Sequence, residues 1–549
     1  MNSLFVRTGV LLALLPLALL PLALLLATGT DLHADEPLAP RIDALIQAKM
    51  GGPASPRTTD AEFLRRVYLD VTGRVPSTGE ARAFLTDTAT NKRELLIDRL
   101  LDSPEYAVRM SDAWHVMLLE RQGESAEWRQ FLRASFSADK PWDQLVRDMI
   151  WSESADESRR GSAFFLSKRL ENYGQNPVDY PGLVRDVGRL FLGVDVQCAQ
   201  CHDHLFVDQY KQDYYQGLFA FLGQAYLRTD VKFPAVAEKP VTQKVEFSSV
   251  FVKEPRSTGP KLPGGMELEI PVIAKGEEYL TPPDKKTNAP GVLKFSPLKL
   301  LAEQLPRADN PLFARNAVNR LWWLVMGRGL VHPLDLQHAD NPPSHPELLD
   351  LLSQEFVAHG FRVKWLLREL LRTEVYQRSS QLPDGVAPDD VSESSFRTAL
   401  ERPLSAEQML ATLWQATGPD TPRLFDPPAT EAEQGKLRER FTKAFANPPK
   451  EPETEYSPSV KAALFLSNDE VVLSWFQPRM GNLVERLQAQ TDDDRMLDEL
   501  YLAILTRTLT DDERAAGKSW LMKNPSQRLL AISRLAWALA SSTEFALNH

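Results

Sequence analysis

Both cysteines of this 549-residue chain lie in one short stretch, Val196-Gln197-Cys198-Ala199-Gln200-Cys201-His202-Asp203-His204. Because no other cysteine exists, no disulfide can join distant parts of the chain, and packing must hold the fold together. Apolar residues recur at three- and four-residue intervals from Leu183 to Val194, which predicts an apolar helix face leading into the stretch. Aromatic residues between Tyr210 and Phe221 predict an apolar wall after it.

The spacing Cys-x-x-Cys-His is the attachment pattern of a c-type haem. In this interpretation the thiols of Cys198 and Cys201 form thioethers with the haem, and His202 is the proximal ligand of its iron. The sequence does not decide which residue would be the distal ligand. The candidates are His115, Met110, Met117 and Met149.

Two other interpretations of the same stretch stay open. Cys198, Cys201, His202 and His204 are all of ligand types that bind zinc or iron, so a bare metal ion is the alternative cofactor. In such a site His202 and His204 are both ligands, and a turn must separate their rings because the residues are so close. The third interpretation is a disulfide between the two cysteines, as in thiol oxidoreductases.

The beginning of the chain is typical of an export signal, and we assign residues 1–34 to a signal peptide. Arg7 supplies the positive start, an apolar run follows at residues 9–27, and the small residues after it suit cleavage. The run is also nearly long enough to span a bilayer, so a membrane anchor formed by residues 9–27 is the alternative. In either case we expect the body of the protein outside the cytoplasm, in the periplasm.

The remaining chain is too long for one hydrophobic core and predicts several domains. We expect a mainly α, multi-domain fold with a small β-rich insert between two helical domains. Helical periodicity defines a first domain at residues 40–223, which carries the Cys-x-x-Cys-His motif, and a second at 293–549. Between them, residues 224–292 alternate apolar and polar side chains among glycines and prolines, as half-buried strands do. The charged segment 429–455 is expected to be a solvated connection.

Charge and motifs exclude several classes of function. The chain has 63 Lys and Arg against 74 Asp and Glu, a formal net charge of −11, and no basic patch with interleaved aromatic residues. Nucleic acid is therefore not an expected partner. No nucleophile elbow, phosphate-binding loop or dinucleotide fingerprint is present.

Two sets of polar residues in the second half have a structural and a functional interpretation. The first set is a cluster in a short proline-rich loop, and it consists of His332, Asp335, His338, Asp340 and His345. We favour a role in capping and bracing the loop over a second metal or substrate site. A buried polar network is expected from the second set, which consists of Arg315, Asn316, Asn319 and Arg320. In the first half, Asp60 is expected to cap the helix that follows it.

A series of short motifs resembles a known family. In the first half they are Glu62 to Pro76, Ser103-Pro104-Glu105-Tyr106 and Gln197 to His204. In the second half they are Asn310 to Arg315, Val318-Asn319-Arg320, Gly327 to Val331, Ser344 to Asp350 and Glu544 to His549. Together they resemble the paired proteins, abundant in planctomycetes, that join a cytochrome-like DUF1549 (PSCyt2) domain to a DUF1553 (PSD1) domain.

The resemblance implies little about activity beyond the description of the DUF1549 domain as cytochrome-like. The family often has proline where this chain has Leu205, and tryptophan where it has Tyr210, so the surroundings of the motif are expected to differ. The chain lacks the separate N-terminal cytochrome domain of longer relatives, which implies at most one haem. Relatives occur in exporting, polysaccharide-degrading bacteria, which implies a link to polysaccharide breakdown.

The leading functional hypothesis is an exported c-type monohaem redox protein, acting in electron transfer or as an oxidoreductase. One alternative is a hydrolase that uses a Cys/His metal site. The other is a non-catalytic binding or scaffold protein whose metal or haem is structural. Whether the protein is an enzyme is left open. A redox partner or an exported partner enzyme is expected, and membrane contact only through an uncleaved N-terminal segment.

Overall fold

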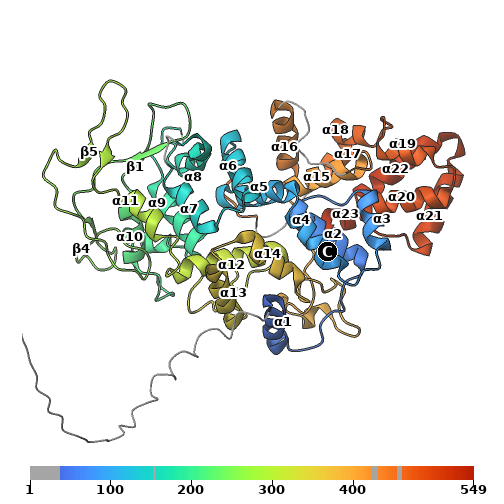
Figure 1. The fold of residues 1–549 in the computed structure, drawn as a ribbon, viewed down its shortest axis with the longest axis horizontal. Helices are drawn as coiled ribbons and strands as arrows, with labels where there is room; N and C mark the ends of the chain where they lie inside the picture. The colour runs from blue at the N-terminus through green and yellow to red at the C-terminus, as the bar shows by residue number, and fades with distance from the viewer. Residues whose placement is uncertain (1–36, 153–155, 173, 422–430, 454–459) are drawn as a thin grey trace, which may run out of the picture.

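The computed structural model describes residues 37–152, 156–172, 174–421, 431–453 and 460–549. Figure 1 shows an elongated, mainly helical protein, with the β-strands β1, β4 and β5 toward one end and the C-terminal helices at the other. The predicted signal peptide, residues 1–34, lies outside the described residues. Within them, no helix combines the length and the apolar character that crossing a membrane requires.

The first half folds into short helices, as the periodicity predicts. The α-helices are α1 (Leu38–Lys49), α2 (Asp60–Thr72), α3 (Thr78–Thr86), α4 (Lys92–Leu101), α5 (Pro104–Leu119), α6 (Ala126–Ser137), α7 (Trp142–Ile150), α8 (Phe164–Arg169), α9 (Tyr180–Val187) and α10 (Gln212–Leu222). The expected cap at Asp60 is wrong by one residue. Thr59 caps α2 instead, because its Oγ1 accepts a hydrogen bond from the Glu62 amide at 3.2 Å.

The expected β-rich insert follows these helices. Its strands are β1 (Ala225–Leu227), β2 (Val236–Glu238), β3 (Val245–Phe247), β4 (Arg256–Thr258), β5 (Tyr279–Thr281) and β6 (Val292–Leu293). They pair as three separate two-stranded antiparallel sheets, β1 with β2, β3 with β4 and β5 with β6. Such small sheets bury little apolar surface of their own, so the connecting loops remain open to solvent.

Limited proteolysis is therefore expected to cut first within residues 225–290. The backbone there forms few ladder hydrogen bonds, and large apolar side chains such as Met266, Val272 and Leu280 are exposed. Local opening at such a segment costs little free energy. Mass spectrometry of the first fragments checks this. First cuts inside α9 or α12 would contradict the expected order of local stability.

Helices return in the second half. They are α11 (Pro297–Gln304), α12 (Pro311–Met326), α13 (Pro346–Ala358), α14 (Val363–Arg372), α15 (Ala406–Thr417), α16 (Glu431–Phe445), α17 (Val460–Asn468), α18 (Glu470–Trp475), α19 (Leu483–Ala489), α20 (Asp493–Leu505), α21 (Asp511–Lys523), α22 (Arg528–Ala540) and α23 (Thr543–Ala546). Two short strands, β7 (Arg402–Pro403) and β8 (Leu547–Asn548), pair antiparallel. The segment expected to be a solvated connection contains α16, whose Phe441 is fully buried.

Two hydrophobic cores organise these helices. The main core joins the first helical half to α11–α14. The second core is built from residues between 404 and 545, together with Leu69 and Val75 from the first half. The region 293–549 is therefore split between two cores, and α2 contributes to both.

Charged side chains of α2 tie the C-terminus to this junction. Arg65 donates to the Phe545 carbonyl at 2.8 Å, and Arg66 donates to the His549 carbonyl at 3.0 Å. One turn later, the Asp70 carboxylate accepts hydrogen bonds from Arg402, Tyr376 and Asn548, the last two at 2.8 Å. The motifs from the two ends of the chain thus meet in one buried polar hub.

Candidate functional site

The Cys-x-x-Cys-His motif lies on a short 3₁₀ turn, Cys198–Gln200, that follows α9 and one π-helical turn, Gly188–Leu192. Ala199 is only 1 % exposed and anchors the turn in the main core. Both cysteines are exposed, and their thiols are free. The Cys201 carbonyl accepts a hydrogen bond from Val250 at 3.0 Å, which fixes the turn against the β-rich insert. The turn therefore presents both thiols at the surface from a fixed backbone.

The hydrogen bond of His202 determines which ring nitrogen is available. Its Nδ1 lies 2.6 Å from the carbonyl oxygen of Asp203. Because a carbonyl oxygen can only accept, Nδ1 carries the proton and Nε2 keeps a lone pair. Histidines that bind a metal commonly orient their rings in this way, through a backbone carbonyl at the other nitrogen. Nε2 of His202 is thus left with a lone pair that is free to act as a ligand.

His204 has the opposite arrangement. Its Nδ1 accepts hydrogen bonds from the backbone amides of Val207 at 3.0 Å and Phe206 at 3.2 Å. In the neutral ring the proton is then on Nε2, which has no lone pair to offer a metal ion. Its backbone amide donates to the Tyr210 carbonyl at 2.8 Å. In this structure His204 closes the loop, and its predicted role as a metal ligand stays a prediction.

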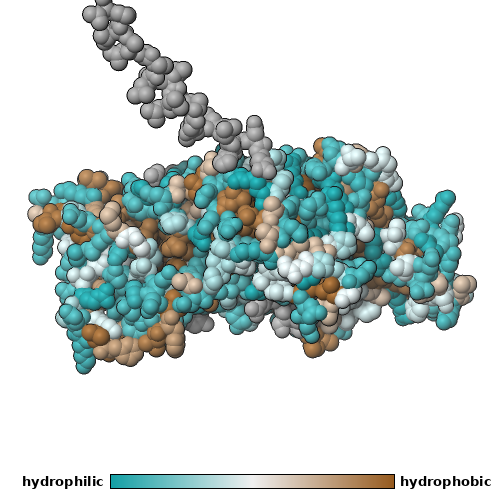
Figure 2. All heavy atoms as spheres, turned by 90° about the horizontal axis from the view of Figure 1, so that it is seen from below, coloured by the Kyte–Doolittle hydropathy of each residue, from teal (hydrophilic) through white to brown (hydrophobic). Residues whose placement is uncertain are grey.

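Exposed apolar side chains surround the motif. Leu205 and Phe206 follow it directly, and Phe206 is 84 % exposed. From the β-rich insert, Val250, Phe251 and Val252 are exposed as well, and the Phe251 ring lies 4.9 Å from that of His202. Figure 2 shows hydrophobic surface at the end of the protein where this insert lies. Exposed apolar side chains therefore lie next to the motif in the sequence and beside the ring of His202.

The predicted aromatic wall after the motif has a different place. Tyr210, Tyr215 and Phe221 are buried in the main core, where they support the turn from behind. The apolar side chains available to cover a group on the thiols come instead from residues 205–206 and 250–252. The sequence did not indicate the second of these segments, because nearly fifty residues separate it from the motif.

The second half of the chain supports the motif from the other side. The Gln337 amide donates to the Gly193 carbonyl at 2.9 Å, and Val194 forms a β-bridge with Leu336. The Tyr210 hydroxyl donates to the Gln337 carbonyl at 3.3 Å, and its ring packs 5.4 Å from that of His338. The motif is therefore fixed between both halves of the chain.

Comparisons with known proteins agree with this two-part construction. A model described as PSCyt2, a protein of unknown function (DUF1549), matches residues 41–226. A model described as PSD1, a protein of unknown function (DUF1553), matches residues 299–460. The chain joins a DUF1549 domain to a DUF1553 domain. The comparison with curated proteins found no match, and neither did the comparison with solved structures.

The other ligands predicted from the sequence are not gathered at the motif. Among the described residues, no three His, Cys, Asp or Glu side chains are placed to hold one metal ion. Of the distal candidates, His115 is buried and accepts a hydrogen bond from Trp128 at 3.1 Å, with its other nitrogen facing Glu124. Met110 and Met149 are buried in the main core. The distal ligand stays open.

The polar cluster of the DUF1553 domain has the bracing role that the sequence favoured. Asp335 pairs with Arg320 and, at 3.3 Å, with Arg189 of the DUF1549 domain. His338 lies 4.0 Å from Asp340. Within the second set, Asn316, Asn319 and Arg320 form the expected buried network, but Arg315 is partly exposed and pairs with Asp350.

His345 of this cluster is expected to weaken the fold in acid. It is 3 % exposed, and burial lowers the pKa of His345 to about 4. Between pH 6.5 and 4 the unfolded chain binds a proton here that the folded chain does not. Stability is therefore lost as the pH falls, by at most about 1.4 kcal/mol for each pH unit over this range. Urea unfolding of wild type and His345→Gln checks this, since the variant should lose that part of the dependence. If the stability of both proteins fell equally as the pH was lowered, this prediction would be contradicted.

A cleft with a volume of about 830 Å³ lies between the two domains. Helix α5 of the DUF1549 domain forms one side. The DUF1553 side is formed by the end of α12, residues 332–335 and the start of α15. On its lining, Arg189 binds Glu120 through two contacts of 2.5 Å. This cleft could not be predicted from residue spacing, because its residues come from elements far apart in the chain.

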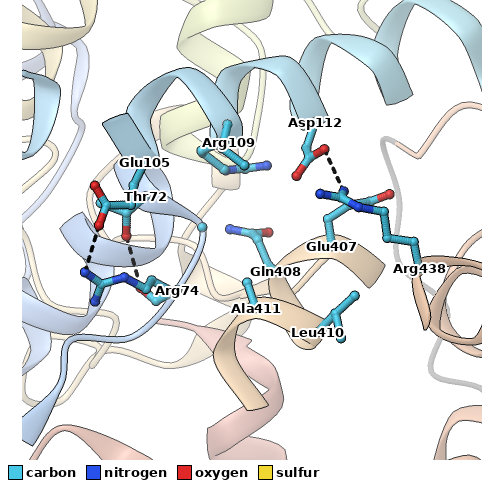
Figure 3. A pocket seen from close by; sticks show the side chains of 12 residues that line it. Thr72, Arg74, Glu105, Arg109, Asp112, Glu407, Gln408, Leu410, Ala411 and Arg438 are labelled. Carbon is cyan, nitrogen blue, oxygen red and sulfur yellow. Dashed lines mark hydrogen bonds and ion pairs between the residues drawn. The ribbon is translucent and has the colours of Figure 1, made fainter. Parts of the chain in front are cut away.

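The charged side chains at one end of the cleft are drawn in Figure 3. Arg109 and Asp112 extend from α5 toward Glu407 and Gln408 on α15. These four residues line both the cleft and a smaller adjoining pocket of about 20 Å³. Asp112 is bound by Arg438 at 3.1 Å.

Proposed function

We propose that the protein is an exported c-type monohaem redox protein. The thiols of Cys198 and Cys201 would hold the haem through thioethers, and Nε2 of His202 would bind its iron. The observation that supports this most directly is the hydrogen bond from His202 Nδ1 to the Asp203 carbonyl, which leaves Nε2 free. A bound haem supplies one-electron transfer.

The residues around the motif suit this role. Both thiols are exposed, so a haem can reach them without unfolding the turn. Phe251 and Phe206 offer exposed apolar surface that would cover part of an attached haem. The Val250 amide donates to the Cys201 carbonyl and the Gln337 amide to the Gly193 carbonyl, so the β-rich insert and the DUF1553 domain both hold the segment that carries His202.

An exposed motif favours electron exchange with a partner protein over chemistry in an enclosed pocket. We therefore propose electron transfer as the activity and a redox protein as the partner. The apolar run at residues 9–27 supports export to the periplasm, where bacterial haem attachment takes place.

The test is the pyridine haemochrome spectrum of the denatured protein, purified after co-expression with a haem-attachment system. The expected result is about one covalent haem per chain, since the chain has a single Cys-x-x-Cys-His motif. A protein without a haemochrome that contains stoichiometric zinc or iron would contradict the proposal. That result would favour the Cys/His metal site.

A further inference from the structure

One charged side chain in the cleft is without a partner. Arg109 is 8 % exposed, and within the described residues its guanidinium forms no hydrogen bond or ion pair. Its Nε is fully buried and unpaired. An isolated buried charge is costly, and proteins rarely keep one without a partner or a ligand.

The position of Arg109 is fixed by the end of α2. Gly73 ends that helix with a φ of 76°, in the left-handed region that glycine adopts readily. A Cβ on Gly73 would lie 3.2 Å from Cδ of Arg109, so the glycine makes room for the arginine stem. Figure 3 shows the side chain reaching from α5 into the pocket, above Gln408.

The neighbouring carboxylates are already neutralised. Asp112 accepts from Arg129 at 2.6 Å as well as from Arg438. Glu407 accepts two hydrogen bonds from Arg121, at 2.5 and 3.0 Å. Burial lowers the pKa of Arg109, and the more distant charges of Asp70, Asp112 and Glu407 act against this lowering. Among the described arginines that line the cleft, Arg109 is the one without a direct hydrogen bond or ion pair to a carboxylate.

We propose that the cleft between the two domains binds a small organic monoanion, whose carboxylate or sulfonate group pairs with Arg109. A guanidinium offers two parallel donors to such a group. One uncompensated cation calls for one negative charge, which disfavours a phosphate dianion. The volume of about 830 Å³ falls in the usual range for small-molecule sites. Met117, Trp323 and Phe445 line it and provide apolar contacts for an organic body.

Binding is tested with four probes of one shape on the purified full-length mature protein. Benzoate and benzenesulfonate are monoanions, benzamide is neutral, and phenyl phosphate is mainly a dianion at pH 7.5. Titration calorimetry should show saturable binding of a monoanion and much weaker binding of benzamide and phenyl phosphate. Comparing the two monoanions distinguishes a carboxylate site from a sulfonate site. No probe depends on haem, so failure of the haem proposal would leave this result unaffected.

Arg109→Gln should lower the affinity for the bound monoanion by about tenfold or more, because a charge-assisted hydrogen bond is lost. The matched control is Arg362→Gln, which removes an exposed arginine paired with Asp139 and should bind as wild type does. Arg109→Gln should melt no lower than wild type, since it removes an uncompensated buried charge. Arg109→Lys keeps the charge but not the paired donors, and should bind with intermediate affinity.

Three outcomes would overturn the proposal. They are no binding of either monoanion at millimolar concentration, equal binding of benzamide, or binding that neither Arg109 variant changes. A lower melting temperature for Arg109→Gln would also count against it, because a stabilising internal partner would then be indicated.

Discussion

Replacement of His202 by alanine is expected to remove most of the stable haem-bound protein, because the proposed axial nitrogen is lost. Cys198→Ala and Cys201→Ala should each abolish covalent attachment or leave a single thioether. The thiols are the exposed groups of the turn, whereas Ala199 between them anchors it, so neither cysteine is needed for packing. Pyridine haemochrome spectra of the denatured variants measure the attached haem directly.

His204→Ala is the matched control for His202→Ala, since both remove one imidazole from the same loop. The His204 ring accepts from the Phe206 and Val207 amides, so its loss should loosen the loop but leave covalent haem in place. A bare-metal site predicts a different result, namely equal loss of zinc or iron in both variants. Metal analysis beside the haemochrome therefore separates the two cofactors. Equal loss of haem in both variants would contradict the assigned roles.

The features that sequence reasoning predicted correctly are local ones. The helix into the motif follows from apolar spacing over a few residues, and it is present as α9 and the π-helical turn after it. The mainly α fold with a β-rich insert follows in the same way, from a change of period near residue 224. The family motifs were recognisable because each is a short run.

The second core was not predictable in this way. Leu69 and Val75 pack among residues beyond 404, and nothing in the spacing of α2 says that Leu69 faces a different core from Phe63 and Val71. The helix α16 was missed because charged residues dominate its surface, and its packing depends on few apolar positions such as Phe441. Both the second core and the packing of α16 depend on contacts between residues far apart in the sequence.

The candidate sites show the same contrast. The two cysteines and His202 stand together in sequence, so their chemistry could be inferred before their geometry was known. The roles of His202 and His204 could not, because the ring proton depends on which backbone groups the fold brings near. Arg109 resembled any arginine on a helix. It is unusual because the nearby carboxylates of Asp112 and Glu407 are paired with other arginines.

Asp70→Ala is expected to destabilise the protein by about 3–5 kcal/mol, the usual cost of removing one partner of a buried ion pair. The Asp70 side chain is 1 % exposed and binds Arg402 at 2.8 Å, so the variant leaves a guanidinium without its counter-ion. Tyr376 and Asn548 lose an acceptor in the same step.

The matched control is Asp309→Ala, which breaks an exposed ion pair with Arg307 and should leave the stability almost unchanged. Urea unfolding followed by circular dichroism measures both. Asp70 joins α2 to strands β7 and β8, so we also expect its loss to separate the unfolding of the second core from that of the main core. If Asp70→Ala unfolded at the same urea concentration as Asp309→Ala, the buried polar hub would contribute no more to stability than a surface ion pair. If it also unfolded in a single transition, packing between the two cores would be what couples them.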